Sequence, residues 1–219
     1  VDDGNGESEA EGDAPPDKTP PQRIVPYVED RRNILILRPH HRLGVLEAET
    51  LTTLQYALKR GIEAVYQLEE SELMAEPLPT RDNRQAILFF EAAEGGAGVL
   101  TRLATEPDAL AAVAAKALEV MHFKAPPAGQ AWQRDSLVEE LDHNGEPYCE
   151  AGCYRCLLSY YNQPDHTLID RKDKAAGGLL LDMLCRLTQA RSNQGTQGRG
   201  PEEHDAQLAR TAGSTLEQA

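Results

Sequence analysis

The sequence predicts an α/β or α+β domain with a small sheet, flanking helices and a zinc knuckle. Short apolar runs typical of strands alternate with longer stretches that have the spacing of amphipathic helices. Three of the four cysteines lie between positions 149 and 156, which is close enough to bind one metal ion. Both ends of the 219-residue chain are polar, so we expect the folded domain to span residues 24–189.

Two strands and one long helix are predicted in the first half of this domain. The apolar runs at residues 33–38 and 86–90 are short and rich in Ile, Leu and Phe, which predicts buried strands. Between them, residues 47–68 carry apolar side chains at spacings of three and four. That spacing predicts an amphipathic helix.

Helices dominate the second half of the domain. A glycine-rich turn at residues 94–98 leads into a helix that begins at Val99, and Pro107 opens another helix. Around the cysteines we expect a knuckle, and after it a short helix over residues 156–161. The last predicted helix covers residues 171–189.

The two ends of the chain differ from the middle in composition. Residues 1–23 predict a disordered acidic linker and residues 190–219 a disordered polar tail. The formal net charge is −14, and most of it belongs to the middle of the chain. An acidic domain is poorly suited to bulk electrostatic binding of nucleic acid. Any such contact would be local, or made by another part of a larger protein.

Composition also bears on the compartment. The sequence has no apolar run of the roughly 18–20 residues that cross a bilayer and no export signal, so no membrane partner is expected. Clustered cysteines in such a chain favour metal binding over disulfides and predict a cytoplasmic location. Because the chain begins with Val1 rather than Met, we interpret it as a fragment of a longer protein.

The cysteine cluster predicts a structural zinc site. Cys153 and Cys156 have the two-residue spacing of a zinc knuckle, and Cys149 lies just before them. A structural zinc takes four ligands in a tetrahedral arrangement, and its binding contributes free energy of folding rather than chemistry.

The fourth zinc ligand is left open by the sequence. We favour His166, which follows a proline that can turn the chain back toward the knuckle. Cys185 lies in the apolar stripe of the last helix, which is more typical of a core thiol. His143 and water are the remaining candidates.

Several other motifs have a structural interpretation and a functional one. The glycine-rich turn could form a backbone nest for phosphate, but a tight strand-to-helix turn explains it as well. His40 and His41 are adjacent and are interpreted as surface residues. Glu91 and Glu94 could act as an acid–base pair or could simply lie on an exposed rim. No complete active site emerges, so catalytic residues are not assigned.

An aromatic run accompanies the knuckle. Tyr154, Tyr160 and Tyr161, together with Arg155, could stack on nucleic-acid bases. Tyrosines beside a zinc knuckle more often pack over the metal, and we favour that interpretation.

Two sequence motifs together resemble the MrfA zinc-binding domain. The first is Cys149-Glu-Ala-Gly-Cys153-Tyr-Arg-Cys156 with the following Asn-Gln-x-x-His, and the second is Phe-Phe-Glu-Ala-Ala-Glu-Gly-Gly-Ala-Gly at 89–98. The resemblance implies a domain at the C-terminus of superfamily 2 DEAD/DEAH-box helicases and helicase-like proteins. The segment at residues 24–35 looks most like the DrmB branch, a component of the DISARM anti-phage defence system.

The resemblance implies that Cys149, Cys153 and Cys156 bind zinc. The sequence departs from the helicase members at the fourth ligand, where they have a cysteine near the position of Asn162; His166 is the expected substitute. The sequence contains no P-loop Gly-Lys-Thr and no Asp-Glu-x-His box, so it carries no ATPase motor. The implied partners are a helicase motor domain or a partner defence subunit, and possibly DNA.

These observations support three hypotheses. The first is a zinc-stabilised accessory domain that docks against a motor or partner subunit and helps to position DNA. The second is a metal-dependent, nuclease-like hydrolase that uses Glu91, Glu94 and His166. The third is a protein-interaction module that makes no contact with nucleic acid.

Overall fold

The computed structural model describes residues 26–27, 29–39, 44–93, 95–128, 130–133 and 137–184. The chain divides into two units, 1–30 and 31–219, and the fold described below belongs to the second. The predicted disordered ends, together with His40, His41, Glu94 and Cys185, lie outside the described residues.

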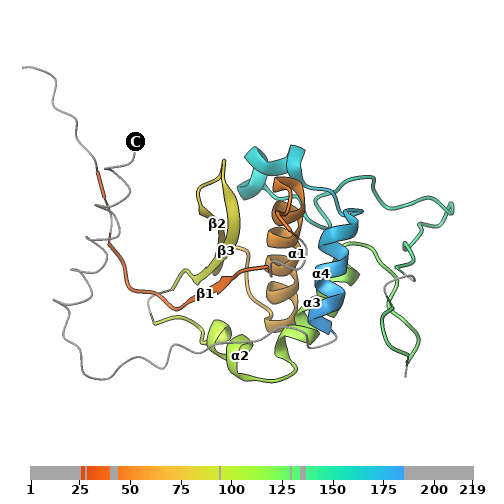
Figure 1. Cartoon of the computed structure of the whole chain (residues 1–219). Coiled ribbons are helices and arrows are strands. Elements are labelled where there is room, and N and C mark those ends of the chain that lie inside the picture. Colours follow the sequence, from red (N-terminus) through yellow and green to blue (C-terminus); the bar gives the residue numbers. More distant parts are fainter. Residues whose placement is uncertain are drawn as a thin grey trace, which may run out of the picture. The chain divides into compact units, whose positions relative to one another are not determined.

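Three strands form an antiparallel sheet in the order β1-β3-β2 (Figure 1). They are β1 (Ile34–Leu37), β2 (Leu73–Pro79) and β3 (Arg84–Glu91). The strands predicted at 33–38 and 86–90 are confirmed, but β2 was missed. Its prolines argue against a strand, yet they are tolerated because β2 lies at the edge of the sheet. The antiparallel pairing makes the fold α+β.

Among the described residues, four α-helices and a 3-10 helix lie on one side of this sheet. They are α1 (Ala48–Tyr66), α2 (Val99–Thr105), α3 (Ala109–Val120), α4 (Lys174–Leu184) and η3 (Tyr160–Leu168). The α-helices confirm the predicted ones, whereas the short helix predicted over 156–161 is wrong. Ser159 has an extended backbone and caps η3 instead, accepting a hydrogen bond from the Tyr161 amide (3.2 Å).

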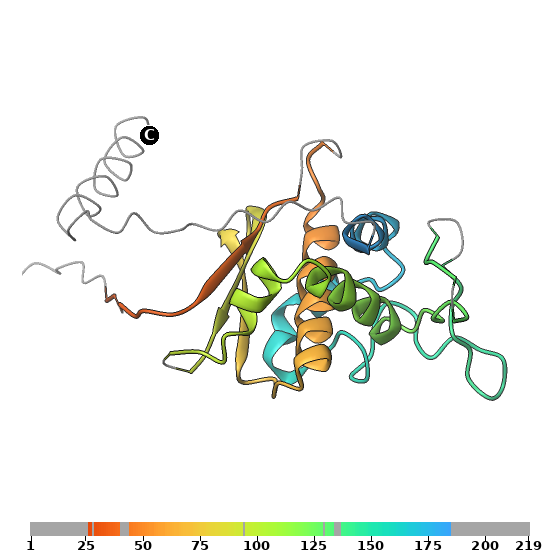
Figure 2. The same cartoon turned by 90° about the horizontal axis from the view of Figure 1, so that it is seen from below.

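Helix α1 is the centre of the core. It lies between the sheet and the pair α3 and α4, and it contacts all three (Figures 1 and 2). Leu54, Leu58 and Ile62 are buried along it. Gly61 lets α3 approach closely, since a Cβ there would lie 2.6 Å from the Val113 carbonyl oxygen. None of the described helices combines the length and apolar character that crossing a membrane requires.

Candidate metal centre

The site begins at the C-terminal end of α3. His122 follows the last helical turn with a left-handed backbone (φ 63°), and its amide donates to the Glu119 carbonyl (2.9 Å). The Phe123 amide donates to the Leu118 carbonyl (3.0 Å), so the two residues close the helix in the position where glycine is usual.

The three cysteines come from the loop and knuckle that follow. The Cys153 carbonyl accepts hydrogen bonds from the amides of Cys156 and Leu158 (both 3.0 Å), which fixes the tight turn. The Cys153 amide donates to the Cys156 sulfur (3.0 Å). None of the three cysteines forms a disulfide. The turn therefore holds Cys153 and Cys156 close together.

These segments bring four ligand atoms together. The Nε2 or Nδ1 atom of His122 and the sulfurs of Cys149, Cys153 and Cys156 all lie within 4.8 Å of one another. Zinc–sulfur and zinc–nitrogen bonds of ~2.3 and ~2.05 Å predict tetrahedral edges of about 3.8 Å for S···S and about 3.6 Å for S···N. Cys149 Sγ lies 3.8 Å from Cys156 Sγ, and His122 Nε2 lies 3.5 Å from Cys153 Sγ. The cluster thus has the size of a tetrahedral zinc site.

The protonation behaviour of the four clustered side chains is consistent with binding a cation. Burial raises the pKa of the Cys156 thiol to about 12 and raises the pKa of Cys149. Burial acts the same way on Cys153, but hydrogen bonds from the Arg155 amide and the neighbouring thiols outweigh it and lower its pKa. Burial, aided by the charge of Arg171, lowers the pKa of His122 and favours the neutral imidazole that metals bind. Buried thiolates need a nearby positive charge, which Zn²⁺ supplies.

Arg171 ties the two ligand-bearing segments together. Its side chain is fully buried (0% exposed). Nε and Nη2 donate to the Cys149 carbonyl (2.9 and 2.6 Å), and Nη1 donates to the carbonyl of Met121, the residue before His122 (3.3 Å). An ion pair with Glu139 (3.2 Å) completes its contacts. One guanidinium therefore sets the spacing between the histidine and the first cysteine.

Comparison with known proteins agrees with this geometry. Residues 54–157 match the family model described as the MrfA Zn-binding domain (MZB). This stretch forms an MZB domain. The matched stretch contains all four residues of the cluster. The family match and the cluster together confirm the predicted cofactor, a structural zinc. No curated protein and no solved structure matches the chain.

His166, the predicted fourth ligand, is not one of the four clustered residues. Its Nε2 is within hydrogen-bonding distance of the Ser159 carbonyl (3.0 Å) and of Asn162 Oδ1 (2.9 Å). His143, another candidate, is exposed in a turn and is not in the cluster. The MZB domain therefore offers His122 in the position that the sequence left open.

His122 was missed because nothing local marks it. It ends an ordinary apolar helix and lies far from the cysteines in sequence. In the structure, the ring of His122 stacks on the ring of Tyr148, the residue before Cys149, with the ring centroids 5.0 Å apart.

The glycine-rich turn of the MZB domain holds a carboxylate of the chain itself. Glu91 accepts hydrogen bonds from the amides of Leu100 (3.0 Å) and Gly98 (3.3 Å) and from Asn33 Nδ2 (3.0 Å). Burial opposes ionisation, but these donors outweigh it and lower the pKa of Glu91. A Cβ on Gly96 would lie 1.8 Å from Glu91 Oε2. The turn interpretation is thus correct, and Glu91 serves as a structural cap.

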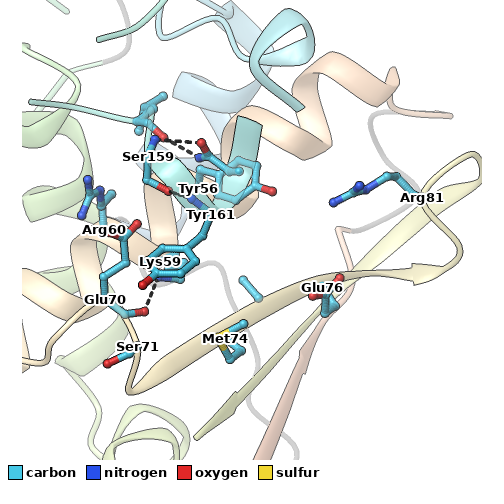
Figure 3. A pocket seen from close by; sticks show the side chains of 13 residues that line it. Tyr56, Lys59, Arg60, Glu70, Ser71, Met74, Glu76, Arg81, Ser159 and Tyr161 are labelled. Atoms are coloured by element: carbon cyan, nitrogen blue, oxygen red, sulfur yellow. Dashed lines mark hydrogen bonds between the residues drawn. The ribbon is translucent and has the colours of Figure 1, made fainter. Parts of the chain in front are cut away.

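The aromatic run that accompanies the knuckle lies at the surface of the domain. Tyr154, Tyr160 and Tyr161 are exposed, and Tyr161 borders a cleft of about 150 Å³ between α1, β2 and the segment after Cys156 (Figure 3). Arg60 lines the cleft and donates to the Cys156 carbonyl (3.2 Å), so the cleft adjoins the knuckle. These aromatic side chains are available to a partner.

Proposed function

We propose that this chain is the zinc-stabilised C-terminal accessory domain of a superfamily 2 helicase-like protein. In this proposal it acts in the cytoplasm, in anti-phage defence of the DISARM type, and docks against a helicase motor domain or partner subunit. Zinc is bound by His122, Cys149, Cys153 and Cys156. The MZB domain is a zinc-binding domain of helicase-related proteins, which supports a helicase partner.

The four-residue cluster is the observation that carries this proposal. Three sulfurs and one imidazole fill a tetrahedral shell, which leaves no open position for a substrate or a reactive water. The zinc would join the end of α3 to the loop and knuckle that follow it, and so stabilise the tertiary structure. Such a site supports a binding role for the domain rather than metal catalysis.

Two further features bear on the alternatives. Glu91 and His166, which the hydrolase hypothesis needs, both form hydrogen bonds within the domain, and this favours the accessory role over hydrolysis. The exposed tyrosines are compatible with stacking on single-stranded DNA and equally with a protein contact.

The ligand set is tested by comparing His122→Ala with His166→Ala. We expect the wild-type protein to hold one zinc per chain, His122→Ala to lose it, and His166→Ala to keep it. Cobalt in place of zinc should give the visible absorption of a tetrahedral thiolate site in the wild-type protein and in His166→Ala. Zinc retained by His122→Ala and lost by His166→Ala would refute the proposed set and favour the other histidine.

The accessory role is tested with a purified superfamily 2 helicase motor domain, the partner class that the proposal names. Adding the chain should change the DNA-stimulated ATP hydrolysis of the motor, and a Cys153→Ser/Cys156→Ser variant should have no such effect. No effect of the zinc-loaded wild-type chain would contradict the proposal. Binding of the chain to single-stranded DNA at several salt concentrations separates DNA positioning from a purely protein-binding role, because phosphate contacts weaken steeply with salt.

A further inference from the structure

The cleft beside the knuckle has the size of a single aromatic ring. Its volume is about 150 Å³, and it opens between α1, β2 and the segment that leads into η3. Tyr56, Met74 and Tyr161 line it (Figure 3), and buried Leu157 adds apolar surface. A cavity of about 150 Å³ is large enough to hold a benzene ring. The cleft therefore has room for one six-membered ring beside Tyr161.

Hydrogen bonds hold the walls of this cleft in place. Lys59 Nζ, on α1, donates to the Glu70 carbonyl just before β2 (3.0 Å). Asn162 is buried, and it accepts from the Ser159 amide and donates to the Leu157 carbonyl (both 2.8 Å). These bonds fix the spacing of α1 and β2 and the segment that carries Tyr161. The cleft is thus formed before a ligand enters, which lowers the cost of binding.

The rim of the cleft offers free hydrogen-bonding groups of both kinds. Within the part of the chain that the structure describes, the carboxylates of Glu70 and Glu76 and the hydroxyl of Ser71 have no hydrogen-bond partner. Arg81 is half exposed, and its Nε pairs with Asp165 (3.5 Å), which leaves its Nη groups for a ligand. A ligand that both donates and accepts hydrogen bonds would satisfy this rim.

Positive charge is in excess at the Arg81 end of the cleft. The two carboxylate oxygens of buried Asp165 already accept from Arg84 (2.7 Å) and from Tyr56 (2.6 Å). The side chain of Arg84 is 1% exposed, and among the described residues its Nη1 has no hydrogen-bond partner. Glu76 lines the same cleft, but no ion pair of the described residues joins it to Arg81. One carboxylate therefore serves two guanidiniums, and a bound anion beside Arg81 would balance the second charge.

A nucleotide matches these features better than an apolar side chain does. A nucleobase is a planar ring that stacks on tyrosine, and its edge carries both donors and acceptors. The carboxylates of Glu70 and Glu76 disfavour a phosphate beside β2, but they accept hydrogen bonds from the amino group of a base. The phosphate of the same nucleotide supplies the anion for Arg81. A Phe or Leu side chain would fill the cleft and leave these polar groups unpaired.

An added peptide strand is a poorer fit to this place. Strand β2 is at the edge of the sheet, where a peptide could pair with its backbone. Pro77 and Pro79 have no amide hydrogen, so two donors of this edge are missing. The edge therefore favours a ligand that inserts a ring over one that extends the sheet.

We propose that the cleft binds one pyrimidine nucleotide, with its base against the Tyr161 ring and its phosphate beside Arg81. This proposal rests on the proposed function, because it gives the DNA-positioning role a binding site. The nucleotide is a unit of single-stranded DNA or a free nucleotide, since the same groups recognise both, and the experiment separates the two sources.

The test measures binding of a fluorescent single-stranded oligo-dC to the zinc-loaded chain by anisotropy. Tyr161→Ala removes the stacking surface, so we expect affinity to fall about 5- to 150-fold, whereas Tyr161→Phe keeps the ring and should bind like the wild type. The matched control is Tyr154→Ala, which removes a similarly exposed tyrosine (63% against 67%) that does not line the cleft. Zinc content and circular dichroism check that each variant is folded. Wild-type affinity of Tyr161→Ala would overturn the inference.

Two further measurements distinguish the base from the phosphate. An abasic strand of the same length keeps the phosphates but has no bases, so it should bind the wild type and Tyr161→Ala equally. Arg81→Gln should reduce the slope of log affinity against log salt by about 0.7, the value of one phosphate contact on a single strand. Abasic DNA that still distinguishes the two proteins, or an unchanged salt slope of Arg81→Gln, would refute the assigned contacts.

Calorimetry with deoxycytidine monophosphate identifies the source of the nucleotide. Oligo-dC that binds at least about tenfold more tightly than the mononucleotide assigns the cleft to a DNA strand, and comparable affinities assign it to a free nucleotide. In both cases Tyr161→Ala should lose the binding.

The outcomes separate this inference from the proposed function. If the zinc-loaded wild-type chain binds neither ligand but still changes the ATP hydrolysis of a helicase motor domain, the inference is overturned and the proposed function stands. If Tyr161→Ala weakens binding to the motor domain and leaves oligo-dC binding unchanged, the cleft is a protein-binding site and the inference is again overturned.

Discussion

Replacing Arg171 with methionine tests how the metal centre is held together. Methionine has a similar length and remains compatible with a buried position, but it cannot donate a hydrogen bond. The change removes the donors to the carbonyls of Cys149 and Met121 and the partner of Glu139. It leaves all four clustered side chains in place.

The magnitude follows from these contacts. A buried acceptor that loses its donor costs about 1–3 kcal/mol, so two carbonyls cost about 2–6 kcal/mol of unfolding free energy. Groups that orient metal ligands without touching the metal typically contribute 10–100-fold to metal affinity. We therefore expect Arg171→Met to lower both the unfolding free energy and the zinc affinity by these amounts.

The assay is denaturant unfolding at fixed free zinc, together with competition against a zinc chelator. Lys172→Met is the matched control, because it makes the same substitution at the next residue. Lys172 is more exposed and pairs with Glu139 and Glu150 at the surface. It should leave zinc affinity unchanged and stability nearly so.

Refutation would be a variant with wild-type zinc affinity and no more loss of stability than Lys172→Met. That result would mean that the loop before Cys149 and the end of α3 hold their spacing without the guanidinium.

Two other substitutions test buried polar contacts elsewhere in the domain. Gly96→Ala should lower the unfolding free energy by about 1–3 kcal/mol more than the control Gly95→Ala. Both residues have positive φ, but only a Cβ at position 96 would meet the Glu91 carboxylate. Equal melting temperatures of the two variants would contradict this contact. Tyr56→Phe should lower the unfolding free energy by about 1–2 kcal/mol, because the Tyr56 hydroxyl donates to buried Asp165 at 2.6 Å. An unchanged denaturation midpoint would show that this hydrogen bond does not stabilise the domain.

Much of the fold follows from local patterns in the sequence. The apolar spacing of α1 and the short runs of β1 and β3 depend only on neighbours along the chain, and both kinds of element were predicted. The pattern did not reveal β2, because Pro77 and Pro79 contradict strand propensity and only an edge position accommodates them. The apolar run of β1 also predicts a fully buried strand, whereas Ile34 and Ile36 are exposed.

Local spacing in the chain is enough to predict the three thiolates of the metal centre and the need for a fourth ligand. Cys149, Cys153 and Cys156 are close in sequence, so a knuckle can bring their sulfurs together whatever the rest of the chain does. Only the tertiary structure brought His122 to them, because its position depends on where α3 ends against α1 and on the contacts of Arg171. A ligand supplied by long-range packing leaves no spacing pattern in the sequence, whereas ligands supplied by one turn do.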